Sequence, residues 1–125
     1  MNVVALIGRV SRPAQERELR SGDRLVAYQL TIPRDGERAE TVPVVWFRAP
    51  ASAVELAVDE EVVVVGRVRQ RFFQSGGGLQ SRTEVVADVV VPRRQAKRAR
   101  EALERAARQL DESQWAERIT PRRRS

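Results

Sequence analysis

Residues 62–73 constrain the fold of this chain more than any other stretch, and they read Val-Val-Val-Val-Gly-Arg-Val-Arg-Gln-Arg-Phe-Phe. Four consecutive valines are typical of a strand that is buried on both faces, because β-branched side chains pack well on a pleated sheet. After Gly66 the pattern changes to strict alternation, which is typical of a strand with two different faces. The stretch therefore predicts one long strand, buried in its first part and alternating in its second.

The alternating part of this strand gathers basic and aromatic side chains. Side chains two residues apart share one face of a strand, so Val68 and Phe72 are predicted to point inward. The opposite face carries Arg67, Arg69, Arg71 and Phe73. Guanidinium groups pair with phosphates and aromatic rings stack on bases, so this row is a candidate platform for single-stranded nucleic acid. The alternative is a solvated face held by surface salt bridges.

Apolar runs and turn residues predict the remaining elements of the first 92 residues. Strands are expected over residues 2–10, 24–32, 41–48, 60–73 and 82–91, with a short polar strand near 16–20. A short helix is expected over residues 51–58, between the third and fourth of the five main strands. This order predicts an all-β fold, a five-stranded Greek-key barrel of the oligonucleotide/oligosaccharide-binding (OB) type. Pro92 is predicted to end this domain.

A change of composition after Pro92 marks a second region, residues 93–125. Residues 94–112 are rich in Ala, Glu, Arg and Gln and predict a C-terminal helix. A thin apolar seam along it consists of Ala96, Ala99, Leu103, Ala106 and Leu110. The helix is either solvated or a docking element, and residues 121–125 are expected to form a disordered basic end.

The positive charge of the chain lies in this second region. Residues 1–91 contain 12 arginines and 12 acidic residues, whereas residues 92–125 contain 11 basic and 5 acidic residues and so carry the whole net charge of +6. A basic chain does not by itself indicate that the barrel binds nucleic acid. Binding by the barrel would have to come from the local arrangement of its charges.

The absence of cysteine and histidine excludes several classes of function. It removes disulfides, the commonest transition-metal ligands and the usual general base of nucleophilic catalysis. No catalytic constellation, metal site or cofactor site is predicted, so the chain is not expected to be an enzyme. No apolar run is long enough for a membrane span and no signal peptide is evident, so a cytoplasmic, nucleoid-associated protein is expected.

Three segments of the chain resemble, in this order, the bacterial single-stranded DNA-binding protein family. They are residues 1–10 (Met-Asn-Val-Val-Ala-Leu-Ile-Gly-Arg-Val), Gly66-Arg67-Val68 and residues 83–88 (Thr-Glu-Val-Val-Ala-Asp). The resemblance covers about residues 1–91. It implies an OB-fold barrel that coats single-stranded DNA, and a homo-oligomer, with a tetramer expected first and a dimer next. The family's acidic, aromatic-tipped C-terminal tail has no match here, so recruitment of repair enzymes through such a tail is not expected.

The resemblance also implies which aromatic residues bind DNA. Phe73 matches the position of a base-stacking aromatic residue, and Phe47 matches another by its place in the strand. Trp46 fits this second position nearly as well, and the two side chains must point to opposite faces, so one of them is expected in the core. Tyr28 is expected in the core. Thr41 stands near where many relatives have another stacking tryptophan.

These patterns lead to one prediction of function and two alternatives. The chain is predicted to bind single-stranded DNA without strong sequence preference, in DNA replication, repair or recombination. Arg9, Arg34 and Arg38 are further candidates for lining the binding path. The alternatives are a barrel used for protein interaction or assembly, and an RNA-binding variant.

Overall fold

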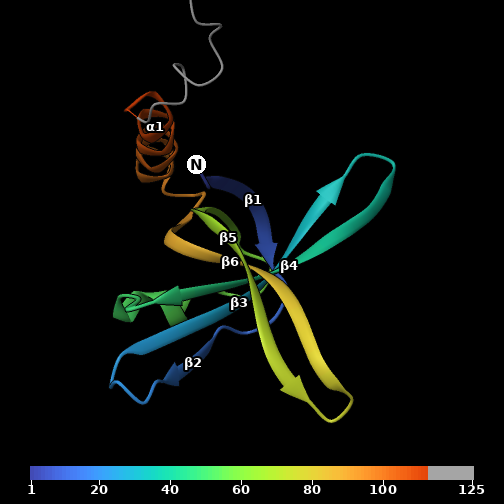
Figure 1. Cartoon of the computed structure of the whole chain (residues 1–125). Coiled ribbons are helices and arrows are strands. Elements are labelled where there is room, and N and C mark those ends of the chain that lie inside the picture. The colour runs from blue at the N-terminus through green and yellow to red at the C-terminus, as the bar shows by residue number, and fades with distance from the viewer. Residues whose placement is uncertain (113–125) are drawn as a thin grey trace, which may run out of the picture.

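Six strands and one helix form the part of the chain that the computed structural model describes, residues 1–112 (Figure 1). The elements are β1 (Val4–Val10), β2 (Gln15–Glu18), β3 (Arg24–Arg34), β4 (Glu37–Phe47), β5 (Glu61–Ser75), β6 (Gly78–Pro92) and α1 (Ala96–Glu112). The prediction of a mainly β domain followed by a helix is confirmed. In residues 1–112, no helix is both long and apolar enough to cross a membrane.

The strands form one sheet in the order β1-β5-β6-β4-β3-β2, and β1 also pairs with β3. Neighbouring strands are antiparallel except β4 and β6, which run parallel over Val44↔Val85 and Val45↔Val86. The pairing of β1 with β3 is short, Arg9↔Thr31 and Val10↔Leu30. The short polar strand predicted near residues 16–20 corresponds to β2, which pairs with β3 along Gln15↔Ala27 to Glu18↔Arg24.

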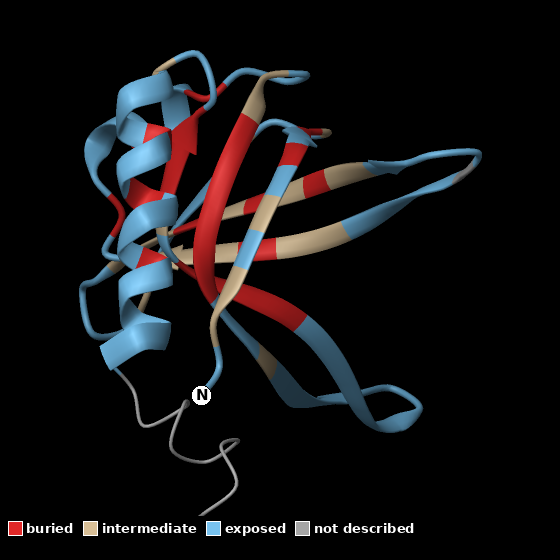
Figure 2. Ribbon diagram, turned by 90° about the horizontal axis from the view of Figure 1, so that it is seen from above, coloured by how far each residue is buried: buried red, intermediate tan, exposed pale blue. Residues whose placement is uncertain are grey.

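The valine run at the start of β5 is buried on both faces, as its composition predicts. Val62 and Val64 belong to the central core, which β1, β3, β4 and β6 also supply. Val63 and Val65 point the other way, into a second apolar cluster beneath α1. Figure 2 shows the buried residues gathered in the centre of the sheet and at its contact with the helix. Tyr28 is buried in the central core, where its hydroxyl donates a hydrogen bond of 2.6 Å to the Ala53 carbonyl oxygen.

Two long hairpins, β3–β4 and β5–β6, extend from the core as exposed arms (Figures 1 and 2). Both hairpins end in two-residue turns, because strand pairing continues to Arg34↔Glu37 and Ser75↔Gly78. The inward placement of Val68 and Phe72 is wrong. Their side chains are 40% and 61% exposed, because this part of β5 has already left the core.

The helix predicted over residues 51–58 is also wrong in type and length. Only residues Ala51–Glu55 are helical, and they form a single 3-10 turn after Pro50. No side chain caps its N-terminus, and Leu56 is already extended, so nothing propagates the turn into an α-helix. Asp59, with a φ of 71°, then turns the chain into β5.

The helix α1 covers the outward side of β5 and β6. Ala99, Ala102 and Ala106 are buried against Val63, Val65 and Val91. The small alanine side chains let the helix backbone approach the sheet closely. The predicted seam is therefore correct at Ala99 and Ala106 but wrong at Ala96, Leu103 and Leu110, which are exposed.

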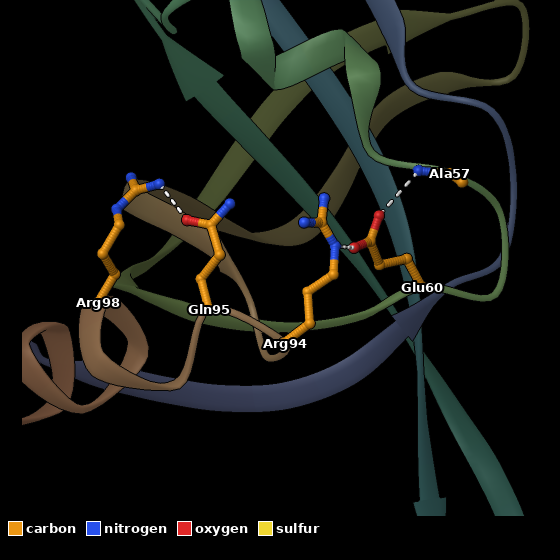
Figure 3. Close-up of polar contacts among 5 residues, drawn as sticks. All are labelled: Ala57, Glu60, Arg94, Gln95 and Arg98. Carbon is orange, nitrogen blue, oxygen red and sulfur yellow. Dashed lines mark hydrogen bonds and ion pairs between the residues drawn. The ribbon is translucent and has the colours of Figure 1, made fainter.

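Two ion pairs link the segment just before α1 to the start of β5, and Figure 3 shows one of them, Arg94 with Glu60. The Arg94 Nε lies 2.6 Å from Glu60 Oε2, and the other oxygen of Glu60 accepts a hydrogen bond from the Ala57 N–H. Arg93 pairs with Glu61 at 2.6 Å. Within the helix start, Arg98 donates a hydrogen bond to the Gln95 side chain.

We expect the attachment of α1 to weaken in acid. The hydrogen bond from Arg94 holds the pKa of Glu60 below its usual range. A carboxylate with a lowered pKa in the folded state stabilises the fold above its unfolded pKa, about 4.3, and this contribution is lost as pH falls through the folded value. The Arg94→Gln substitution should therefore lower the free energy of unfolding at pH 7, and this destabilisation should disappear as pH falls through the folded-state pKa of Glu60.

Denaturant unfolding of both proteins between pH 7 and pH 2.5 measures this difference. Arg100→Gln is the matched control, because it removes the same charge from an exposed position of α1. A destabilisation by Arg94→Gln that is equal at every pH would contradict the prediction.

Candidate nucleic-acid interface

A groove with a volume of about 410 Å³ lies on the outer side of the sheet. Its walls come from β2, β3, β4, β5 and β6 and from the segment before β2. Five arginines line it: Arg12, Arg17, Arg69, Arg71 and Arg82. The one carboxylate in its lining is Glu84. We call this site the groove below.

Strand alternation forms the floor of the groove. Val26, Tyr28 and Leu30 of β3 point into the core, so Leu25, Ala27 and Gln29 face outward and line the groove. The same alternation in β4 sends Trp46 to the core side, and Pro43, Val45 and Phe47 to the groove. The core residues Tyr28 and Val44 also contribute to the groove lining. The groove therefore has a largely apolar floor with arginines around it.

Glu84 is the buried charged residue of this site. Its side chain is 2% exposed. Glu84 Oε2 accepts from Arg69, whose Nε and NH2 lie 2.8 and 2.6 Å away. Glu84 Oε1 lies 3.5 Å from Arg71 Nε. One carboxylate thus binds two members of the predicted arginine row, and the direct register Arg69↔Glu84 explains why they meet.

Each of these two arginines also lies against an aromatic ring. The guanidinium carbon of Arg69 is 5.2 Å from the centre of the Phe47 ring. The guanidinium carbon of Arg71 is 5.4 Å from the centre of the Phe73 ring. Both distances are within the range of cation–π attraction. The structure also decides between the two neighbouring aromatic residues: Phe47 faces the groove, and Trp46 packs against the core.

Six of the predicted site residues do not line the groove: Arg9, Arg34, Arg38, Trp46, Arg67 and Phe73. The side chain of Arg67 is exposed and makes no hydrogen bond or ion pair within residues 1–112. Arg9 lies on the outward side of β1, where it donates a hydrogen bond of 3.4 Å to the Asp59 carbonyl oxygen. Arg34 lies near the tip of the β3–β4 hairpin and pairs with Glu40 at 2.8 Å. The row predicted on β5 is therefore divided: Arg69 and Arg71 line the groove, whereas Arg67 and Phe73 do not.

Three arginines of the groove were not predicted from the sequence. Arg82 is the cross-strand neighbour of Arg71, and Arg12 and Arg17 come from the segment around β2. In the described part of the chain, none of the three makes an ion pair or side-chain hydrogen bond. Only strand register could have identified them, because nothing local distinguishes them from other surface arginines.

The described residues, 1–112, contain no group of three His, Cys, Asp or Glu side chains that could hold a metal ion. The groove therefore has to be understood from its arginines, its aromatic rings and its single carboxylate. Planar cations and rings that alternate along an open surface suit a flexible polyanion with unpaired bases.

The strand order is that of an OB-fold domain. The chain belongs to the single-strand binding protein family, whose model matches residues 1–107. The family resemblance seen in the sequence is thus confirmed. No curated protein matches the chain significantly.

A solved structure agrees with this assignment. The chain is similar to a deletion mutant of the single-stranded DNA binding protein from Thermus aquaticus, with 26% sequence identity and a TM-score of 0.61. The similarity covers 74% of this chain and 40% of the Thermus chain. The matched part of this chain thus corresponds to less than half of that protein.

Proposed function

We propose that this protein binds single-stranded DNA along the groove, without strong sequence preference and without catalysis. The observation that carries the proposal is the lining of the groove by five arginines and the ring of Phe47, with Phe73 beside it. Membership of the single-strand binding protein family and the similarity to the Thermus protein support it. A place in DNA replication, repair or recombination follows from the same proposal.

The proposed contacts divide between charge and stacking. Arg12, Arg17 and Arg82 have no carboxylate partner in the described residues and are proposed to pair with phosphates. Phe47 and Phe73, with the guanidinium groups that lie on them, are proposed to stack on bases. Stacking accepts every base, so this arrangement supports binding without sequence readout.

The test is binding of fluorescent oligo(dT), the matching RNA and duplex DNA at two salt concentrations. Single-stranded DNA should bind more tightly than duplex, because a duplex cannot present unstacked bases to the rings. Equal affinity for duplex and single strand would overturn the proposal. Tighter binding of RNA than of DNA would favour an RNA-binding variant.

We expect Phe73→Ala to weaken binding of oligo(dT) by about 1–3 kcal/mol, with the salt dependence nearly unchanged. The matched control is Phe72→Ala, because Phe72 is the adjacent ring, is more exposed and points to the opposite face of β5. The control should bind like the unaltered protein. Equal losses in both variants would show that the hairpin, and not the Phe73 ring, is responsible.

We also propose that the protein forms a homo-oligomer, a tetramer or a dimer. Exposed apolar side chains on β1 and α1, among them Ile7 and Leu103, are candidates for its contacts. Sedimentation at micromolar concentration measures the assembly, and a monomer under these conditions would contradict it.

A further inference from the structure

We propose that Glu84 is a positioning residue that assigns Arg69 and Arg71 to base stacking instead of phosphate binding. The inference rests on the proposed function of the groove and goes beyond it, because it gives the arginines of one site two different roles. The sequence alone predicts that Arg69 and Arg71 bind phosphates, as does Arg67 in the same row.

The first step of the argument is that both arginines are paired with the same buried carboxylate. Glu84 is almost completely buried, so its carboxylate must keep a cationic partner, and it has two. Both carboxylate oxygens are used, Oε2 by Arg69 and Oε1 by Arg71. A phosphate that approached either guanidinium would compete with a carboxylate already in place. It would also be repelled by that carboxylate.

The second step is the orientation of the guanidinium groups. Glu84 fixes one edge of Arg69, and the Phe47 ring lies 5.2 Å from its guanidinium carbon. Arg71 is placed in the same way between Glu84 and Phe73. A guanidinium held by a carboxylate and a ring keeps a flat surface on which a base can stack. Two arginine–ring pairs, Arg69 with Phe47 and Arg71 with Phe73, thus share one buried carboxylate.

The third step is the contrast with the remaining arginines. Arg82 lies directly opposite Arg71 on the neighbouring strand, in the same groove, and has no carboxylate partner within residues 1–112. Arg71 and Arg82 therefore occupy the same part of the groove, and they differ in that only Arg71 is paired with a carboxylate. This pair offers a matched comparison of a positioned and a free arginine.

The experiment measures the affinity for oligo(dT) against salt concentration for Glu84→Gln. Glutamine keeps the size of the side chain but removes the charge, so Arg69 and Arg71 become available to phosphates. Each phosphate contact adds about 0.7 to the slope of log affinity against log salt, so the slope should become steeper by about 0.7–1.4. The preference for single strands over duplex should fall at the same time. A merely structural role of Glu84 would weaken binding without steepening the slope.

A second pair of variants keeps the proposal testable if Glu84→Gln does not fold, which circular dichroism would show. Arg82→Gln should lower the slope by about 0.7. Arg71→Gln should weaken binding with the slope nearly unchanged. Equal changes of slope in the two variants would overturn the role of Glu84. Failure of the unaltered protein to bind oligo(dT) would instead overturn the proposed function, and this inference with it.

Discussion

Replacing Gly66 with alanine should destabilise the protein by about 3 kcal/mol or more, the upper range for adding an atom to a packed interior. A Cβ at this position would lie 2.1 Å from the Val86 carbonyl oxygen and 2.9 Å from the Ala87 Cα. Both obstacles are backbone atoms of β6, so no side chain can rotate out of the way. The two strands would have to separate where β5 leaves the core.

The same substitution should reduce DNA binding. Gly66 stands at the register shift between β5 and β6, just before the residues that carry Arg69 and Arg71 into the groove. A displacement there would move both arginines relative to Glu84. Thermal unfolding and oligo(dT) binding measure the two effects, and unchanged stability would contradict the expected clash. Gly76→Ala is the matched control, because no atom lies within 4 Å of its added Cβ.

Removal of residues 93–125 should have the second large effect, on stability and on assembly. Val63, Val65 and Val91 would lose the helix that covers them. Each buried valine contributes about 1.5–3 kcal/mol, so several kcal/mol are lost unless another surface covers the face. In solution, a second copy of the truncated chain can cover the apolar face that α1 leaves exposed. We therefore expect lower stability together with larger species in sedimentation.

A substitution within the full chain separates the effect of α1 packing from the effect of the charge that truncation removes. Ala102→Glu places a carboxylate in the buried contact of α1, whereas Ala107→Glu places the same group on the exposed side of the helix. Only Ala102→Glu should reproduce the effect of the truncation. If truncation changed neither stability nor assembly, α1 would neither stabilise the sheet nor prevent its apolar face from associating with another copy.

The truncated protein should still prefer single-stranded DNA, because all groove residues lie within residues 1–92. It should bind more weakly at low salt, since the deleted region carries the whole net charge of +6. At high salt the difference should shrink, because a Debye length of about 8 Å or less screens distant charges. Loss of binding at every salt concentration would place the binding element in the deleted region. The expected basic end at residues 121–125 lies outside the described residues.

Much of the fold could be predicted from local patterns. The valine run indicated a strand buried on both faces, and alternation in residues 24–32 indicated which side of β3 enters the core. These predictions succeed because side-chain burial follows directly from strand periodicity. The helix over residues 51–58 and the inward position of Phe72 failed. Chain direction after Pro50 and the departure of β5 from the core depend on partners that are distant in sequence.

The sequence by itself determined the strands, the C-terminal helix and the presence of an arginine and aromatic row on β5. Only the tertiary structure decided which members of that row share a site. Strand register brought Glu84 beside Arg69 and Arg82 opposite Arg71, and parallel pairing of β4 with β6 brought Phe47 to the same groove. Local periodicity states which side of a strand a residue occupies. The residues that meet across strands depend on register, which is set by contacts between segments far apart in the chain.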